Sequence, residues 1–420
     1  MNGAEGICLC VGLRVMTMAA ASSVISAATS FRSLFSWLPC SSRHHHRHSH
    51  PREFASAFLH SLKFTLLPRC KASNSKEHVA TNSQCGLRLA VSASRSVAQT
   101  CFGGSRASHT EAATGMDHVK FIKDVAACEV PVHLQSLLNL LHAKGDKIVS
   151  PENRRGIIPL AIPLAEDHLS SSIIALLRWP TPPEGMELPV VQVQKYGVFL
   201  LAKSVDQYMH RLLVEADVEG KNLDPYFSAT GDIGRHLYSV GDFMKSKFSS
   251  LDAYLLKMVG LFPDVFERLA LKHLERGDEV SALVSGEFYA TKGHFPGFGR
   301  PIVFNAELML KVGRKTEARD AAKIALKLPW WTLGNSYEKV AEIAGWGDEK
   351  IEYMKEKITE DGKKEELQKG KALAQVALDQ GAFLLDLATV DGSWDDIREP
   401  LASCYTEAGL ENLSKFINWH

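Results

Sequence analysis

Two patterns of apolar residues divide the chain after residue 116. Apolar residues recur at helical spacing first, and they predict a helix over 117–127 and a second, with a leucine-rich face, over 133–143. Runs of branched apolar residues then predict four strands, over 157–164, 172–179, 189–194 and 198–203. Prolines in the first run place that strand at a sheet edge. From residue 204 onward the helical period returns and continues to the end.

The helical part begins at Ser204, which forms a capping-box pattern with Gln207 three positions later. Glycines separate the helices that follow. We expect these helices over 223–243, 251–259, 262–276, 278–290, 303–312, 316–328, 335–345, 347–358, 363–369, 371–388, 394–408 and 410–418. The fold class is therefore α+β and predominantly α-helical, with a small, mainly antiparallel sheet module followed by a helical-hairpin domain.

The helices over 303–312 and 316–328 form the clearest helical hairpin. Gly313 stands where a left-handed residue ends the first helix, and Pro329 cannot continue the second. The order of glycine, alanines and proline resembles half of a tetratricopeptide repeat. No second copy at a fixed period is visible. A single hairpin and a repeat array both remain open, so the domain is only partly tetratricopeptide-like.

A loop rich in glycine and proline, 294–301, precedes this hairpin, and the sequence Pro329-Trp330-Trp331 follows it. The loop lacks the third glycine of a dinucleotide-binding fingerprint and the Gly-Lys-Ser/Thr of a phosphate loop. One interpretation is a buried aromatic corner that fixes helix geometry. The other is a surface for a protein partner, since aromatic residues and arginine anchor interfaces. The candidate interface residues are Phe295, Phe298, Arg300, Trp330 and Trp331.

Charge separates residues 1–115, which we call the leader, from the rest. The chain as a whole has 48 basic and 48 acidic residues, but the leader holds 12 Lys+Arg against 4 Asp+Glu, together with 19 serines. A basic, serine-rich and acid-poor leader is typical of an organellar transit peptide, and the Ala-Ser run after Met18 favours the chloroplast. A secretory signal is the alternative, because 7–28 is fairly apolar. The histidine tract 44–50 is interpreted as low-complexity sequence.

The rest of the chain offers few signs of catalysis or metal binding. Only Cys128 and Cys404 follow the leader, without metal-ligand spacing. The motifs of zinc proteases, serine hydrolases, redox Cys-x-x-Cys sites and nucleotide-binding loops are missing. His236, His294 and Glu287 are more simply explained as packed or surface residues. We therefore predict no enzyme, cofactor or metal, and the acidic balance after residue 116 disfavours nucleic-acid binding. No stretch there is long and apolar enough to predict an integral membrane segment.

Several segments after residue 116 resemble the plant family called protein in chloroplast ATPase biogenesis. They are 117–124, 158–164, 175–180, 260–264, 295–301, 329–334 and 382–388, and they occur in order along 116–420. The resemblance implies a non-catalytic assembly factor of the chloroplast stroma, which helps the γ subunit of ATP synthase join the soluble catalytic core. It transfers no site residues, and the oligomeric state stays unknown.

Three expectations follow for the organisation and function of the chain. We expect a transit peptide and leader over 1–115, the N-terminal helices and sheet module over 116–203, and the helical domain over 204–420. The physical features fit the assembly factor that the resemblance implies. They equally fit a helical scaffold or adaptor for another plastid complex, and an enzyme with an unrecognised site is a third class. A pocket with converging carboxylates or histidines of shifted pKa would favour the enzyme.

Overall fold

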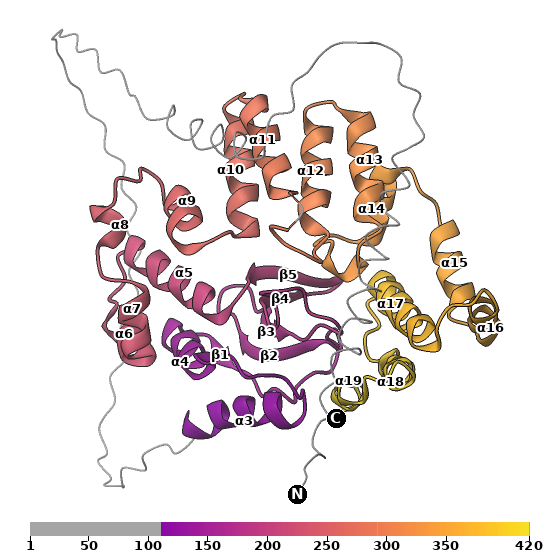
Figure 1. Cartoon of the computed structure of the whole chain (residues 1–420). Coiled ribbons are helices and arrows are strands. Elements are labelled where there is room, and N and C mark those ends of the chain that lie inside the picture. Colours follow the sequence, from indigo (N-terminus) through magenta and orange to yellow (C-terminus); the bar gives the residue numbers. More distant parts are fainter. Residues whose placement is uncertain (1–110, 292, 420) are drawn as a thin grey trace, which may run out of the picture. The chain divides into compact units, whose positions relative to one another are not determined.

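A five-stranded antiparallel sheet lies among the helices of the protein (Figure 1). The structure is a computed structural model that describes residues 111–291 and 293–419. All of them belong to one unit, Ala57–His420. The predicted transit peptide and leader, except for 111–115, and the histidine tract lie outside the described residues. The α+β class with a majority of helix is confirmed.

Each strand of the sheet pairs with the next one along the chain. The strands are β1 (Lys147–Ile148), β2 (Ala161–Glu166), β3 (Ile173–Leu177), β4 (Val190–Gln194) and β5 (Gly197–Ala202). Almost every residue of β2 and β3 is buried, as expected for strands covered on both faces. Helix α4 (Leu134–Lys144) packs against β1 and β2, whereas α5 (Val205–Val218) and α10 (Pro263–Glu275) contact β5.

The prediction that the first strand forms the sheet edge is wrong. The short β1, which the sequence did not reveal, lies outside β2 and pairs with Ala165 and Glu166. The ladder between β2 and β3 shifts its register between Pro163 and Ala165. Pro163 therefore lies at an irregularity, beyond the two residues that β1 covers, where a missing backbone donor is tolerated.

The capping box at Ser204 is confirmed, with one shift in its second half. Ser204 Oγ accepts a hydrogen bond of 3.2 Å from the backbone N–H of Gln207. The Gln207 side chain in turn accepts 2.8 Å from the N–H of Lys203, one residue earlier than the usual partner. Both bonds join the end of β5 to the start of α5, so the strand and the helix are held at a fixed angle.

Residues 223–243 do not form the single helix that we predicted. They form α6 (Asp224–Thr230), α7 (Asp232–Leu237) and α8 (Asp242–Lys245). Gly231 and Gly241 have φ of 63° and 78°, outside the helical region, so each one interrupts the helix. The next segment begins as α9 (Leu251–Tyr254) and continues as a π-helix, η2 (Leu255–Val259).

Two helical hairpins stand side by side beyond β5 (Figure 1). The first is α10 with α11 (Glu279–Tyr289), and the second is α12 (Arg300–Lys311) with α13 (Lys315–Ala325). Gly277 and Gly313, with φ of 75° and 79°, follow the first helix of each. A tandem pair thus replaces the single hairpin. The pair packs through α11 and α12, where a Cβ on Gly286 would come within 2.8 Å of Leu308.

The remaining helices complete two apolar cores. They are α3 (Glu111–Asp124), η3 (Trp330–Thr332), α14 (Tyr337–Ala344), α15 (Glu349–Lys357), α16 (Glu360–Gln368), α17 (Leu373–Asp391), α18 (Arg398–Glu407) and α19 (Glu411–Ile417). The larger core runs from Phe121 through the sheet to Ile417, and the smaller one lies around Trp330. Among the described helices, α17 has the length and composition of a membrane span, yet it packs against α15, α16 and α18 as a core helix does.

Candidate functional site

The loop that the sequence singled out is buried. Phe295 and Phe298 are 5% and 4% exposed. Phe295 packs edge-to-face on Tyr289 at 5.4 Å between ring centroids, and Phe298 does so on Trp179 at 5.4 Å. Gly297 has φ of 82°, and a Cβ there would come within 2.9 Å of the Trp179 ring. The two phenylalanines join the hairpins to the sheet.

Trp330 and Trp331 are buried on the other side of this corner. The ring of Trp330 lies 3.9 Å from that of Tyr337, and its indole N–H donates to the Leu326 carbonyl at 3.1 Å. Trp331 packs on Trp179 at 5.3 Å. Its carbonyl lies so close to Gly197, in the β4–β5 turn, that a Cβ there would overlap it.

Arg300 is held by two carboxylates at the start of α12. Its guanidinium makes a two-bond contact with Glu267, at 2.8 and 2.7 Å, and a third bond to Glu307 at 3.2 Å. Burial opposes the charge, but the bonds to Glu267 outweigh it, and the pKa of Arg300 is raised. All five candidate residues are thus engaged inside the fold. Their burial favours the aromatic corner, the first of the two interpretations.

A buried carboxyl completes the corner, and no sequence pattern pointed to it. Asp386 of α17 accepts a hydrogen bond of 2.7 Å from the backbone N–H of Trp330. Burial raises its pKa from the ordinary 3.8 to about 8, although this bond and the nearby charge of Lys350 act in the opposite direction. A neutral carboxyl at this place still provides an oxygen that accepts from the backbone N–H of Trp330, the residue that follows Pro329 at the start of η3.

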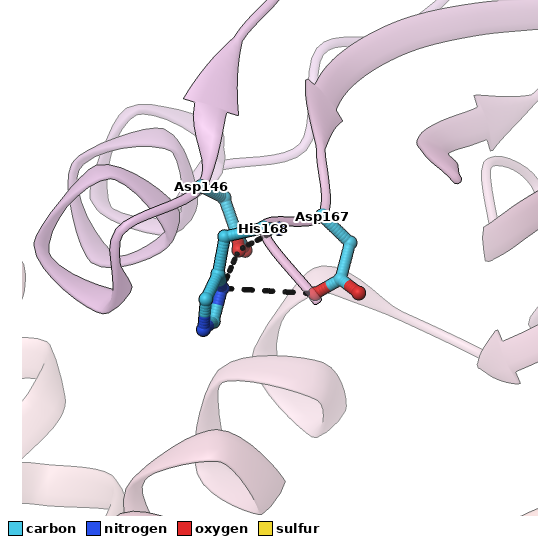
Figure 2. Close-up of side chains that lie close together, drawn as sticks. All are labelled: Asp146, Asp167 and His168. Atoms are coloured by element: carbon cyan, nitrogen blue, oxygen red, sulfur yellow. Dashed lines mark hydrogen bonds and ion pairs between the residues drawn. The ribbon is translucent and has the colours of Figure 1, made fainter. Parts of the chain in front are cut away.

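The described residues contain one cluster with the composition of a metal site, formed by Asp146, Asp167 and His168 (Figure 2). His168 Nδ1 lies 2.7 Å from Asp146 and 4.0 Å from Asp167. Lys144 already forms ion pairs with both carboxylates, with Nζ at 3.0 Å from Asp146 and 2.8 Å from Asp167. A divalent cation would need to displace this ammonium group, so the donor set fits a metal poorly.

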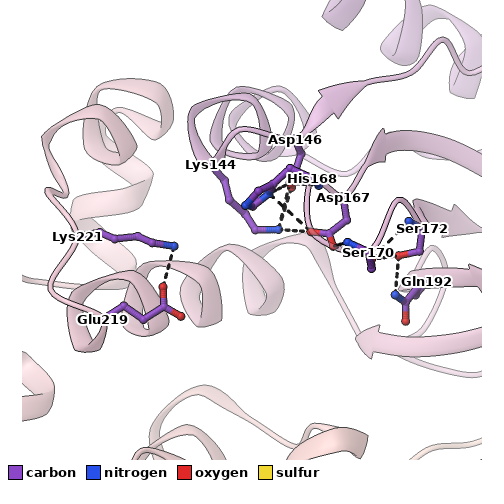
Figure 3. A network of polar contacts seen from close by, with 9 residues as sticks. All are labelled: Lys144, Asp146, Asp167, His168, Ser170, Ser172, Gln192, Glu219 and Lys221. Atoms are coloured by element: carbon purple, nitrogen blue, oxygen red, sulfur yellow. Dashed lines mark hydrogen bonds and ion pairs between the residues drawn. The ribbon is translucent and has the colours of Figure 1, made fainter. Parts of the chain in front are cut away.

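The same cluster extends along the turn between β2 and β3 (Figure 3). Asp167 accepts from the hydroxyl and the backbone N–H of Ser170, and Gln192 donates to Ser172. Burial would raise the pKa of Asp167, but the bonds from Lys144 and Ser170 lower it well below its usual range. Burial likewise opposes the charge of Lys144, yet the two aspartates raise its pKa. These ion pairs and hydrogen bonds join the turn between β2 and β3 to the end of α4, so the cluster fixes that turn.

The isolated nucleophile and base candidates are also unsuited to catalysis. Burial raises the pKa of the Cys404 thiol to about 11, so the thiol stays protonated at neutral pH. Cys128 and Cys404 are both free thiols. His294 Nδ1 lies 2.8 Å from the Phe288 carbonyl, and burial lowers the pKa of its imidazole.

A groove of about 960 Å³ is the remaining feature of interest. Four segments line it, 127–132, 178–188, 203–205 and 409–413. The floor contains Arg178 and Trp179, which are 8% and 7% exposed. Val132, on the rim, is 91% exposed. No sequence pattern indicated this groove, because its walls come from segments that are far apart along the chain.

The fold and these sites define a helix-dominated α+β protein with tandem helical hairpins, a sealed aromatic corner and an open groove. Three family models match it in succession from residue 116 onward, PAB N-terminal over 116–258, PAB middle domain over 263–347 and PAB C-terminal domain over 351–420. The chain therefore belongs to the PAB family, which confirms the resemblance.

A curated relative supports the same conclusion. The chain is 54% identical, over 300 residues, to the Arabidopsis thaliana protein named "Protein IN CHLOROPLAST ATPASE BIOGENESIS, chloroplastic". The match covers 71% of this chain and 90% of the relative. No solved structure matches the chain.

Proposed function

We propose that this protein is a non-catalytic assembly factor for the chloroplast ATP synthase, and that it acts on the γ subunit in the stroma. The observation that carries the proposal is the 54% identity to a relative named for chloroplast ATPase biogenesis, in a match that covers 90% of that relative. The composition of the leader, typical of chloroplast import, supports the compartment. The γ subunit is the partner that the family resemblance implies.

The described structure is compatible with binding rather than catalysis. In its most suggestive polar cluster Lys144 forms ion pairs with both aspartates, and its buried carboxyl, Asp386, accepts from a backbone donor. A transient holder of a protein subunit needs apolar anchors with a polar rim and no reacting group. The buried aromatic corner does not offer these anchors, so we place the partner on another surface.

The test is affinity capture of the tagged chain from chloroplasts, with bound proteins identified by mass spectrometry. The proposal expects the γ subunit to be enriched over bulk stromal proteins. Enrichment of a different complex without any ATP synthase subunit would instead support the scaffold or adaptor class. A parallel capture with an unrelated tagged stromal protein controls for abundance.

A further inference from the structure

Three donor nitrogens at the floor of the groove have no acceptor among the described residues. Of the described residues, only Ala126 accepts a hydrogen bond from the guanidinium of Arg178, at its Nε, so both terminal nitrogens are left over. The indole N–H of Trp179 is buried without any acceptor. A buried donor without an acceptor, as at the indole nitrogen of Trp179, is uncommon in folded proteins, because it loses its hydrogen bonds to water. The floor is therefore suited to a group that brings oxygen acceptors.

Positive charge concentrates below the same floor. Arg178 lies 5.4 Å from the ring centroid of Phe416, and Arg154 lies over the same ring at 3.9 Å. Burial and the charges of Arg398 and Arg178 together lower the pKa of Arg154 to about 9. A carboxylate entering the groove would be attracted to this cluster, and a guanidinium fork matches its two oxygens.

The rim combines an apolar anchor with the opposite charge. Val132 projects almost fully into solvent, which is unusual for a valine next to a hollow. Three exposed glutamates, Glu129, Glu187 and Glu411, stand on the surrounding segments. They would repel a uniformly acidic segment and attract lysine or arginine. The occupant that fits has one carboxylate at its centre and basic residues beside it.

The wall that carries Val132 is fixed before any partner arrives. Ala127 has φ of 49°, the left-handed conformation that closes α3, and the N–H of Cys128 donates to the carbonyl of Ile122 at 3.1 Å. The Ala126 carbonyl accepts from Arg178 at 2.6 Å. Arg178 therefore offers free donors to the groove and also holds the wall of the groove in place. Because this wall is already ordered, binding costs less conformational entropy.

We infer that this groove docks a segment of the ATP synthase γ subunit. A carboxylate of that segment, from a side chain or the chain end, contacts Arg178. An apolar side chain of the segment covers Val132, and flanking basic residues contact the rim glutamates. The inference rests on the proposed function and names the surface that performs it.

The test measures binding of purified γ subunit to the full chain and to matched variants. Val132→Asp and Arg178→Gln are each expected to weaken binding about tenfold or more, as central interface residues do. Arg178→Lys keeps the positive charge but not the forked guanidinium, so it should weaken binding less than Arg178→Gln does. Val280→Asp is the control, because Val280 is also an exposed valine, 74% exposed, on the distant helix α11. It should bind within about twofold of the unmodified chain.

A photo-crosslinking residue at position 132, compared with position 280, keeps the inference testable if Arg178→Gln fails to fold. Crosslinks to γ from position 132 alone would support the groove. Unchanged binding by Val132→Asp, or crosslinks to γ from position 280 alone, would overturn the groove while leaving the proposed function intact. Crosslinks from position 132 to the leader or to a second copy would also overturn it. Failure of the unmodified chain to bind γ would overturn the proposed function and the groove together.

Discussion

Individual side chains in the aromatic corner carry ionisable groups into a mostly apolar setting, and each is matched by a partner from another helix. Arg300 bridges Glu267 of α10 and Glu307 of α12, with its side chain 14% exposed. Asp386 of α17 meets the backbone of η3. Removing one partner from such a pair leaves a buried group without its bond, which costs more than losing an ion pair on the surface.

Arg300→Ala should lower the free energy of unfolding by about 3 kcal/mol, because Glu267 would be left buried without its bidentate partner. The matched control is Arg314→Ala, which removes a pair with Glu317 whose side chains are both 48% exposed. That change should cost less than about 1 kcal/mol. Urea unfolding measures both. Equal effects would show that the Arg300 pair does not support the corner.

Asp386→Asn should flatten the dependence of stability on pH. The pKa of Asp386 in the folded protein, about 8, lies above its ordinary value of 3.8. The folded state therefore holds a proton that the unfolded chain has lost, and stability falls as pH rises from about 4 towards 8. Asparagine stays neutral and can still accept from Trp330.

Thermal unfolding at pH 6 and pH 8 measures this difference. The native chain should lose on the order of 2 kcal/mol more than Asp386→Asn over this interval. Asp379→Asn, on the same helix but with a side chain 31% exposed and paired with Lys371, should keep the native slope. Identical slopes for all three proteins would contradict a protonated Asp386.

Elements meet at close backbone contacts that only glycine allows. The turn between β4 and β5 reaches the 3₁₀ helix η3 at Gly197, whose φ of 134° belongs to glycine and whose missing side chain makes room for the Trp331 carbonyl. This contact, together with Trp179 against Phe298 and Trp331, attaches the hairpins to the sheet.

Gly197→Ala should destabilise the protein by about 3 kcal/mol or more, since the new Cβ would overlap backbone atoms that cannot rotate away. Gly313→Ala is the control, because Gly313 also has a positive φ, 79°, but has nothing within 4 Å of the Cβ position. It should cost only about 1 kcal/mol of backbone strain. Equal losses would mean that strain alone, and not the contact with η3, explains both.

The same elements show how far the sequence could predict the fold. Helix periods and glycine caps located most helices, and the alternation of branched residues located four strands, because these signals are local. Strand β1 has only two residues, and its pairing with β2 depends on contacts that no local pattern shows. The hairpin of α10 and α11 was not recognised as a counterpart of the hairpin of α12 and α13, because the two share the glycines of their turns, Gly277 and Gly313, while the surrounding residues differ.

The candidate site was harder to predict for a physical reason. Phe298, Arg300 and Trp331 are residue types that occur both in protein interfaces and in buried corners. Only the contacts of Trp179 with Phe298 and of Glu267 with Arg300, which the fold creates, decide in favour of the corner. The groove brings 127–132 beside 409–413, which no spacing in the sequence could reveal.

At the scale of the whole molecule, the C-terminal helices close the sheet module. Arg154, before β2, donates to the carbonyl of Phe416 in α19 at 2.6 Å. Arg398 of α18 donates back to the carbonyls of Arg154 and Ile157. The larger core includes residues from Phe121 to Ile417. These contacts predict that the sheet and the last helices unfold together.

Phe416→Ala should lower the free energy of unfolding by about 4 kcal/mol, because Phe416 is fully buried among Phe121 and two arginines. Trp419→Ala, where the ring is 43% exposed, should cost about 1 kcal/mol. Circular dichroism and tryptophan fluorescence should report one shared transition in each case. A separate early transition of the helices would contradict the coupling.

The most direct test of the central claim, that the protein assists assembly of the chloroplast ATP synthase, is to measure the assembled catalytic core by native gel electrophoresis in chloroplasts depleted of the protein. Our account predicts a deficit of assembled core with free α, β and γ subunits still synthesised, and recovery when the native chain is restored. A normal amount of assembled core in depleted chloroplasts would contradict it.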